Sequence, residues 1–462
     1  MGEKRKGNPN WYEVRHPNGR ISYRKKVQDS SGTHNLQGRV EESLSDAASV
    51  WDIATHNVTP HNIPLTPATE DVLGALRDAD IDPLIVGGSV RDSLISSDPP
   101  KDIDIECHHT DGADHLRDAL TGFRVDEVGQ SFGVLKVRHK GEDFDISLPR
   151  RDSAPAGNKK HRGIVATTDP AMSLTEASKR RDFTFNALSY DPERDVLIDI
   201  HGGVGDLDTG TLRVVDEETF TDDPLRVLRG VQFAGRYGMT WDEDSSALAR
   251  RMSWEGLARE RVDIEMRKLL VKGNSYARGL SALRDAGWEG AVPDINAAYA
   301  LDYGGWRIID RIPAITKDPA LRAAHMGKWL AHDRDAGRYM SQMGLSRREY
   351  KRVLPVLESI RNPGDKLLLR RGLRAWVTNE EELKTAHKLR RAMRDYDDTS
   401  RRIGEHPWTV PEPYRVDGEM LKNLGVAPGP NMGMALENSR IVQDRNGEIT
   451  DAQIRIIADR YR

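Results

Sequence analysis

The chain has 462 residues, of which 37% are hydrophobic and 31% charged, with a formal net charge of −4 and a single cysteine, Cys107. This length is sufficient for about three domain-sized units. One cysteine excludes an internal disulfide framework, so we expect a reducing, cytoplasmic setting. No apolar run approaches the roughly 18 residues of a membrane helix, and no apolar signal segment follows the charged N-terminus. With so small a net charge, a nucleic-acid partner must be bound by local basic patches.

Residues 1–65 are expected to form a basic N-terminal extension and linker. Residues 1–26 are rich in Lys and Arg, and the segment WYEVRHPNGRISYRKKV predicts two short strands around an Asn-Gly turn. A basic hairpin with aromatic residues is suited to contact RNA, but a solvated appendage without a partner is the favoured alternative. Residues 28–65 are polar, with one weak helical pattern near 40–56, and we expect them to form a linker or peripheral packing.

A folded head begins at Thr66, which is a plausible N-cap followed by Pro67 in the first helical turn. We expect a helix to about Ala79, then the apolar strand PLIVGG, a second helix and the alternating strand DIDIE. FGVLKVR and EDFDISL are further strand candidates, and the periodicity from about 220 to 400 is helical. The sequence therefore predicts an α+β head followed by a helical remainder.

The apolar strand runs into Gly87 and Gly88 and then into a helix that begins with Ser89 and Arg91. Glycines let a backbone approach a ligand closely, and a helix N-terminus attracts phosphate. The hydroxyl and the guanidinium add further donors for phosphate oxygens. Such a glycine pair before a helix is usually only a tight turn, so its interpretation as a phosphate site depends on the neighbouring motifs.

Asp102 and Asp104 alternate with isoleucines, so a strand places both carboxylates on one face. Such a pair repels unless a cation lies between the two groups, and Mg²⁺ typically takes one or two carboxylates together with substrate phosphates. Asp145, on another alternating strand, is a candidate third carboxylate or the base for an attacking hydroxyl. Glu106 falls on the same face as Asp104 but further along. An ordinary acidic strand is the alternative, yet a glycine loop beside metal carboxylates is what nucleotidyl transfer requires.

Two later segments carry candidate nucleotide contacts. In the first, RRDFTFNAL, Arg181 is placed to reach a triphosphate, and Asp182 and Asn186 to orient that arginine or the sugar. The alternative is a helix start with surface arginines.

In the second segment, Asp223, Arg226, Arg229 and Gln232 recur at every third position of a predicted helix and share one face. An Asp beside an Arg presents an acceptor next to a donor. This pattern matches the pairing edges of cytosine and adenine and opposes those of uracil and guanine. The alternative is an exposed, salt-bridged helix face.

The motifs GGSVRD, DID, RRDFTFNAL and DDPLRVLRGVQFAGRYG resemble, in order and rough spacing, those of the class II tRNA nucleotidyltransferase/poly(A) polymerase family, and most closely its CCA-adding enzymes. ERVDIEMRKLL is similar to that family's neck helix, and VDGEMLKNLGVAPGPNMGMAL to its C-terminal segment. The resemblance covers roughly residues 80–460. It implies a polymerase-β-like nucleotidyltransferase head at 66–215, a base-reading neck at 216–275, a helical body at 276–400 and an RNA-binding tail at 401–462.

The resemblance also implies a reaction in which the 3′-hydroxyl of tRNA attacks the α-phosphate of CTP or ATP and pyrophosphate leaves, with Mg²⁺ stabilising the developing charge. It implies metal binding by Asp102 and Asp104 and nucleotide contacts from Gly88, Arg91, Arg181, Asp223, Arg226 and Arg229. Three positions depart from the family pattern, which usually has a Glu, an acidic residue and an Arg where this chain has Asp222, Ala177 and Gln232.

Several alternatives stay open. Residues 132–135 favour CCA addition over poly(A) synthesis or over partial (CC- or A-) addition, as does the absence of a basic segment after IIADRYR. A phosphohydrolase site at His332 and Asp333, near His325, is a second class, although that segment reads as an amphipathic surface helix. A non-catalytic RNA-binding protein is a third, because basic residues at 347–352 and 384–394 fit RNA phosphates. The oligomeric state is not indicated.

Overall fold

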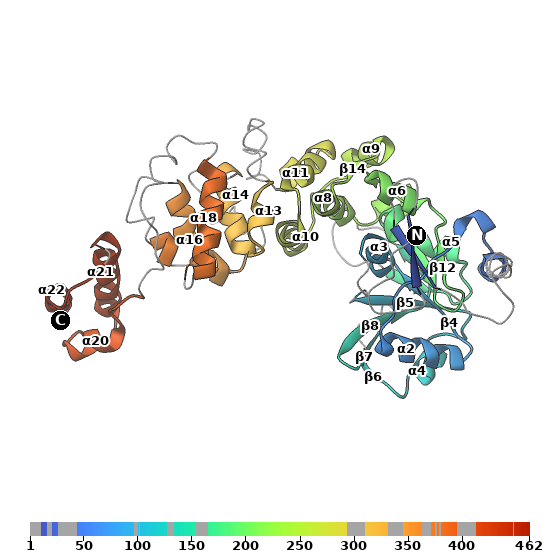
Figure 1. Cartoon of the computed structure of the whole chain (residues 1–462), viewed down its shortest axis with the longest axis horizontal. Helices are drawn as coiled ribbons and strands as arrows, with labels where there is room; N and C mark the ends of the chain where they lie inside the picture. Colours follow the sequence, from blue (N-terminus) through green and yellow to red (C-terminus); the bar gives the residue numbers. More distant parts are fainter. Residues whose placement is uncertain are drawn as a thin grey trace. The chain divides into compact units, whose positions relative to one another are not determined.

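The computed structural model describes residues 11–15, 21–25, 44–96, 100, 102–126, 134–153, 165–292, 310–330, 345–361, 371–374, 377, 380–394, 413–446 and 448–462. The chain divides into two compact units (Figure 1). Unit 1 comprises residues 1–226 and 241–252, and unit 2 comprises residues 227–240 and 253–462.

An eight-stranded mixed sheet forms the centre of unit 1, in the order β3-β12-β11-β4-β5-β8-β7-β6. Its strands are β3 (Val58–Pro60), β4 (Asp82–Val86), β5 (Ile103–His108), β6 (Arg124–Asp126), β7 (Val134–His139), β8 (Glu142–Ser147), β11 (Ser189–Asp191) and β12 (Val196–Ile198). Every neighbouring pair is antiparallel except β5 and β8, which run parallel. The three strands expected from PLIVGG, DIDIE and EDFDISL are therefore neighbours in this sheet.

Shorter strands and helices complete unit 1. The antiparallel pair β1 (Trp11–Arg15) and β2 (Ile21–Lys25) confirms the predicted N-terminal strands, and β9 (Arg150–Ser153) pairs with β10 (Val165–Thr168). The helices are η1 (Thr55–Asn57), α2 (Pro67–Asp78), α3 (Gly88–Ile95), α4 (Ala113–Ala119), α5 (Leu174–Ser178), η2 (Thr184–Asn186), α6 (Gly203–Thr209), α7 (Glu217–Thr221) and α9 (Glu243–Arg251), with a short strand β13 (Thr211–Leu212). As predicted, Thr66 caps α2 by accepting from Thr69 N at 3.1 Å.

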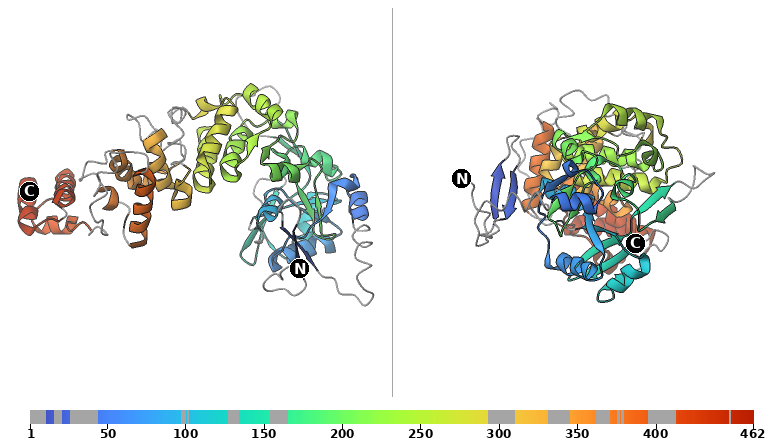
Figure 2. Two further views of the ribbon diagram at one scale, coloured as in Figure 1. Left: turned by 45° about the horizontal axis from the view of Figure 1, so that its top comes forward. Right: turned by 90° about the vertical axis from the view of Figure 1, so that its right-hand side faces the viewer.

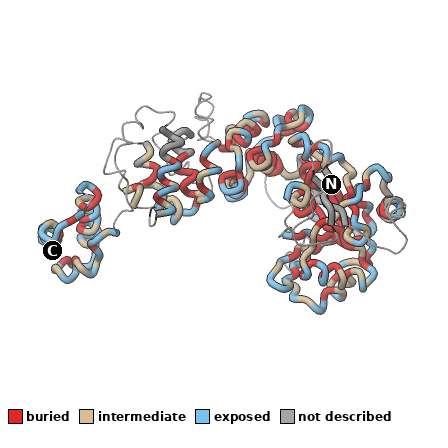
Figure 3. The backbone as a smooth tube through the Cα atoms, viewed as in Figure 1, coloured by how far each residue is buried: buried red, intermediate tan, exposed pale blue. Residues whose placement is uncertain are grey.

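The two faces of β5 have different surroundings. Ile103, Ile105 and Cys107 belong to the main core, which also contains the buried residues of α2 and α4. Asp104 and Glu106 alternate with them and point to the opposite face. Figure 3 shows the buried residues concentrated along the central strands of unit 1. The packed face thus fixes β5, and the other face is left for polar side chains.

Residues 44–65 pack against the sheet of the head, as the second of the two expectations for this segment has it. Residues 44–50 are helical, and β3 extends the sheet beside β12. Ala47, Trp51 and Val58 are buried in one cluster with residues of β4, α5 and β12, and Figures 1 and 2 show this segment beside the sheet. The reason is that its few apolar residues are spaced to cover the second face of the sheet, although the composition around them is polar.

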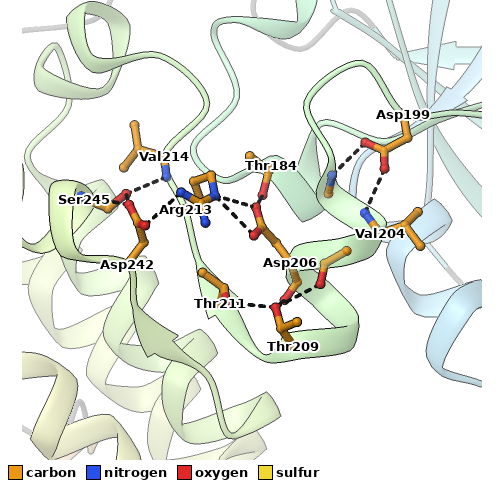
Figure 4. A network of polar contacts seen from close by, with 12 residues as sticks. Thr184, Asp199, Val204, Asp206, Thr209, Thr211, Arg213, Val214, Asp242 and Ser245 are labelled. Atoms are coloured by element: carbon orange, nitrogen blue, oxygen red, sulfur yellow. Dashed lines mark hydrogen bonds and ion pairs between the residues drawn. The ribbon is translucent and has the colours of Figure 1, made fainter. Parts of the chain in front are cut away.

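A polar network joins η2 to the helices next to it (Figure 4). Asp206 in α6 accepts hydrogen bonds from Thr184 Oγ1 at 2.7 Å and from Arg213 Nε at 3.1 Å. Arg213 also donates to Asp242 Oδ1 at 2.8 Å, just before α9. The start of α6 is itself capped by Asp199, which accepts from the main chain of Gly203 at 2.7 Å. This network holds η2 at a fixed place beside the sheet.

Unit 2 is helical in the part of the chain that the structure describes, as the sequence predicts. Its helices are α10 (Arg259–Lys272), α11 (Tyr276–Asp285), η3 (Glu289–Ala291), α13 (Ile312–Ile315), α14 (Pro319–Leu330), α16 (Arg347–Arg361), α18 (Glu380–Arg394), α20 (Gly418–Asn423), α21 (Pro430–Asn446) and α22 (Asp451–Tyr461). Helix α8 (Leu225–Tyr237) begins in unit 1 and continues into unit 2, where the short strand β14 (Thr240–Trp241) begins. None of the helices in the described ranges combines the length and apolar character needed to cross a bilayer.

The element order confirms the expected fold class, an α+β head followed by helical segments. Residues 132–133 and the pair His332 and Asp333 lie outside the described residues. His325 is buried in α14 and hydrogen-bonds the carbonyl of Leu321 at 2.9 Å, one turn earlier. One ring nitrogen of His325, Nδ1, is therefore hydrogen-bonded within its own helix.

Candidate active site

The glycine loop between β4 and α3 lies at the centre of the candidate site, next to side chains from other elements. Gly87 has φ +76°, a conformation that favours glycine, and its N–H donates to Leu188 O at 3.0 Å. A Cβ atom at Gly87 would lie 3.1 Å from Arg181 Nη1 and 3.8 Å from Asp104 Oδ2. The sequence predicts the glycine loop, Arg181 and Asp104 from separate motifs, and the structure brings them together. Arg181 belongs to residues 180–182, which we call the RRD segment.

Ser89 and Arg91 are buried at the start of α3. The Ser89 hydroxyl donates to Val86 O at 3.2 Å. Arg91 donates through Nη1 to Asn186 Oδ1 at 2.5 Å and through Nε to Asp92 Oδ1 at 2.8 Å, and only 5% of Arg91 is exposed. These side chains therefore fix the loop against η2. A Cβ at Gly88 would lie 3.5 Å from Arg91 Nη2, an ordinary van der Waals contact, so this packing does not itself require glycine there.

Asn186 and Asp182 extend this network. Asn186 Nδ2 donates to Asp182 Oδ1 at 2.9 Å, and the same oxygen accepts from the main chain of Phe183 at 2.9 Å. Both residues are at most 6% exposed. In this structure the two side chains therefore help to fix the segment that carries Arg181.

The three candidate carboxylates lie at one end of the parallel strand pair. Asp104 is directly opposite Asp145 in the register of β5 and β8, and Asp102 immediately precedes β5. Burial raises the pKa of Asp104 and the negative charges of Asp145 and Asp102 raise it further, against the lowering effect of Arg181. Lys136 on β7 approaches Asp145, with its Nζ 3.2 Å from Asp145 Oδ1.

These carboxylates fit a hard cation that is also bound by ligands from outside the protein, such as phosphates and waters. Among the residues that the structure describes, no group of three or more His, Cys, Asp and Glu side chains has the arrangement of a complete metal cage. Mg²⁺ is usually bound by one or two carboxylates together with phosphates and waters. Mutual repulsion of Asp104 and its acidic neighbours is the electrostatic feature that such a cation relieves.

A buried glutamate that the sequence reading did not assign lies beside the arginines. Glu106 Oε2 is 2.8 Å from Arg180 Nη2 and 3.7 Å from Arg181 Nη2, and Glu106 Oε1 is 3.1 Å from His108 Nε2. Despite burial, His108 and the two arginines hold the pKa of Glu106 far below its usual range. Burial and the neighbouring charge of Arg180 lower the pKa of Arg181 to about 10. The alternation of DIDIE was the only signal for Glu106.

In the segment that the sequence predicts to read the base, Asp223 and Arg226 both hydrogen-bond main-chain groups. Asp223 Oδ1 accepts from Leu225 N at 3.1 Å, at the start of α8. Arg226 is 7% exposed and donates to Thr219 O at 2.9 Å and to Arg180 O at 2.6 Å. A buried guanidinium needs acceptors for its N–H groups, and here main-chain carbonyls supply them. Arg226 thus fastens the RRD segment to the start of α8.

The remaining two residues of that face lie in unit 2. Arg229 is placed over the ring of Phe233, 5.7 Å from its centroid. Gln232 is 4% exposed, and its buried Oε1 has no hydrogen-bond partner. The alternative of a uniformly exposed, salt-bridged face therefore does not hold for Arg226 and Gln232. Ala177, where the resembled family has an acid, is fully buried in α5.

Residues 84–213 match the family model of the poly(A) polymerase head domain. The multifunctional CCA protein of Stenotrophomonas maltophilia is 36% identical over 225 residues, which cover 47% of this chain and 52% of that protein. The multifunctional CCA protein of Xanthomonas euvesicatoria is 35% identical over 225 residues, with the same coverage. The chain thus spans about half the length of the curated relatives that it matches.

Solved structures show the same fold over a longer stretch. The crystal structure of the Bacillus stearothermophilus CCA-adding enzyme in complex with CTP superposes with a TM-score of 0.55 at 20% identity, covering 86% of this chain and 98% of that one. At this identity the likeness establishes the fold. The chain thus contains a poly(A) polymerase head domain at residues 84–213 and is similar to multifunctional CCA proteins over about half of its length.

Proposed function

We propose that the chain is a template-independent tRNA nucleotidyltransferase that adds CCA to tRNA 3′ ends from CTP and ATP. The observation that carries the proposal is the meeting of Gly87, Arg181 and Asp104 at one point, with Asp145 opposite Asp104. A phosphate-binding loop, an arginine and paired carboxylates are the groups needed to hold a nucleoside triphosphate for attack at its α-phosphate. The relatives named CCA proteins support the choice of reaction.

Each residue has a part in this mechanism. Asp102 and Asp104 would hold Mg²⁺, which when bound aligns the phosphates and stabilises the charge that develops on them. Asp145 is available to complete the carboxylate set or to accept the proton of the tRNA 3′-hydroxyl. Arg181 binds phosphate oxygens, and Gly87 and Gly88 let the nucleotide approach the N-terminus of α3. Ser89, Arg91, Asp182 and Asn186 hold that loop and the RRD segment together.

We assign the choice of base to the start of α8, through Asp223, Arg226 and Arg229. Arg226 already binds the carbonyls of Thr219 and Arg180, so its replacement would disturb the fold as well as base reading. Replacement of Asp223 is therefore the clearer test of base reading. The helical body and tail would contact tRNA phosphates, and the reaction would take place in the cytoplasm.

Poly(A) synthesis or partial CC- or A-addition is the second candidate, because the matched family model is that of a poly(A) polymerase head. The test is extension of tRNA transcripts that end at the discriminator base, at CC and at CCA, with CTP, ATP or both. Growth that stops at CCA and needs CTP before ATP supports the proposal. ATP tails that run past CCA favour the polymerase, and binding without extension favours a non-catalytic RNA-binding protein.

A further inference from the structure

The adjacent residues Arg180 and Arg181 differ in how far their guanidinium groups are free to contact a ligand. The Arg180 side chain is 10% exposed and its Nη2 lies 2.8 Å from Glu106 Oε2. The Arg181 side chain is 19% exposed and its Nη2 lies 3.7 Å from the same oxygen, while its Nη1 faces Gly87. One arginine is thus directly paired, and the other reaches the loop where a nucleotide is expected.

Two guanidinium groups this close repel each other when they are removed from water. The negative charge of Glu106, whose side chain is 3% exposed, offsets one of the two positive charges. Glu106 is itself fixed on its other side, because Oε1 contacts His108 Nε2 at 3.1 Å. The ring systems of Trp51 and His108 pack in a T-shaped arrangement, with centroids 5.3 Å apart. The carboxylate therefore has a defined position that does not depend on a ligand.

The main chain of the same segment is fixed independently. Arg226 Nη2 donates to Arg180 O at 2.6 Å. Because this contact holds the backbone, the contacts of Glu106 act on the side chains and on their charge balance. A change of charge at Glu106 is therefore expected to alter the arginines without releasing the segment.

We propose, on the basis of the proposed function, that Glu106 is a positioning residue that pairs off Arg180, so that Arg181 alone presents its guanidinium to the phosphates of the incoming nucleotide. Without the charge of Glu106, Arg180 and Arg181 repel and Arg181 is displaced from the loop. Without the charge of Arg180, Glu106 becomes the nearest partner of Arg181 and draws it away from the phosphates. Each single loss is harmful for an opposite reason, and loss of both charges restores the balance.

The experiment is a double-mutant cycle of Glu106→Gln, Arg180→Gln and the combined variant, with Glu70→Gln on the exposed side of α2 as the matched control. CTP affinity is measured by direct titration, and KM for CTP, KM for tRNA and kcat by incorporation. Each single variant is expected to weaken CTP binding about tenfold, the scale of one charged hydrogen bond, with KM for tRNA unchanged. The combined variant is expected to return to within about threefold of wild type.

A merely structural role predicts a different pattern. The proposal is overturned when the two losses add or the combined variant binds CTP more weakly than either single one, or when Glu106→Gln binds like wild type. When Glu106→Gln does not fold, the comparison of Arg180→Gln with the combined variant decides, because recovery is still required. Recovery of CTP binding in a protein that extends no tRNA would keep this inference and refute the proposed function. A wild-type protein that binds no CTP would refute both.

Discussion

Asp104 in β5 lies directly opposite Asp145 in β8, on the one pair of neighbouring strands in the main sheet that runs parallel. Paired residues on adjacent strands are about 5 Å apart. Two carboxylates at this spacing disfavour each other's charge, which contributes to the raised pKa of Asp104. Lys136 offsets part of the charge on the outer side of Asp145. A cation between the two strands would offset the rest.

Asp145→Asn is expected to lower the rate of nucleotide incorporation by about 10² or more, because a proton acceptor or metal-binding carboxylate is lost. The Mg²⁺ concentration that gives half-maximal rate should rise. The matched control is Asp126→Asn on β6. Asp126 is an exposed acid that is paired with Lys136, the residue that is paired with Asp145 on the opposite neighbouring strand. Wild-type rates for Asp145→Asn, with an unchanged Mg²⁺ dependence, would remove Asp145 from the chemistry.

Asp223→Ala is expected to relax the discrimination between CTP or ATP and UTP or GTP, because the exocyclic amino groups of C and A lose their acceptor. Competition assays with all four nucleotides measure this. Asp244→Ala, at an exposed position in the first turn of α9, is the control. If Asp223→Ala still excludes UTP and GTP as wild type does, base reading lies elsewhere. A fall in thermal stability alone would point to the contact of Asp223 with Leu225 N.

Gly203→Ala is expected to lower the free energy of unfolding by about 1–3 kcal/mol, as overpacking does. A Cβ at Gly203 would lie 2.3 Å from Thr184 O and 2.9 Å from Phe185 Cα, so α6 and η2 must separate. Incorporation should fall as well, because η2 carries Asn186. In the same helix, a Cβ at Gly205 meets nothing within 4 Å, and Gly205→Ala should be neutral or stabilising by up to about 1 kcal/mol. Equal stability of the two variants would contradict this close packing.

His325 links the stability of the helical unit to pH. Burial lowers its pKa from 6.5 to about 4, and its hydrogen bond to Leu321 O opposes the shift only in part. Between these values the unfolded chain binds more protons than the folded one, so stability falls as pH drops from about 6.5 toward 4. His325→Gln should therefore lose less stability than wild type, by about 2–3 kcal/mol, between pH 7 and pH 4.5.

Chemical denaturation at several pH values measures this difference. His56→Gln, at an exposed position in η1, should keep the wild-type dependence. The account of His325 is contradicted if its variant loses stability on acidification as steeply as wild type.

Local patterns in the sequence predicted the strands that carry the carboxylates of the candidate site. The alternation around Asp102 and Asp104 placed the two residues on one face, and the similar alternation around Asp145 was consistent with a second strand beside them. The sequence did not show that β8 pairs directly with β5, because strand order depends on contacts between distant segments. The Thr66 cap and the helix after it were predictable because such capping is local.

Other features depend on burial, which a local pattern does not reveal. Glu106 looked like one more strand acid, but Arg180, which lies 74 positions further along the chain, makes it a buried counter-charge. The sequence likewise did not show that Arg226, a predicted base reader, also donates to carbonyls of α7 and of the RRD segment. Trp51 stood in polar surroundings, and only the assembled sheet provides the apolar surface that buries it.

The most direct test of the account compares wild type with the Asp102→Ala/Asp104→Ala variant on a tRNA transcript that ends at the discriminator base. Extension with CTP and ATP in Mg²⁺ is followed on a sequencing gel, and tRNA affinity is measured in parallel. The account predicts that wild type extends to CCA and stops. It predicts that the variant incorporates nothing while binding tRNA within several-fold of wild type. Incorporation by the variant at the wild-type rate would show that these two carboxylates are not the catalytic centre.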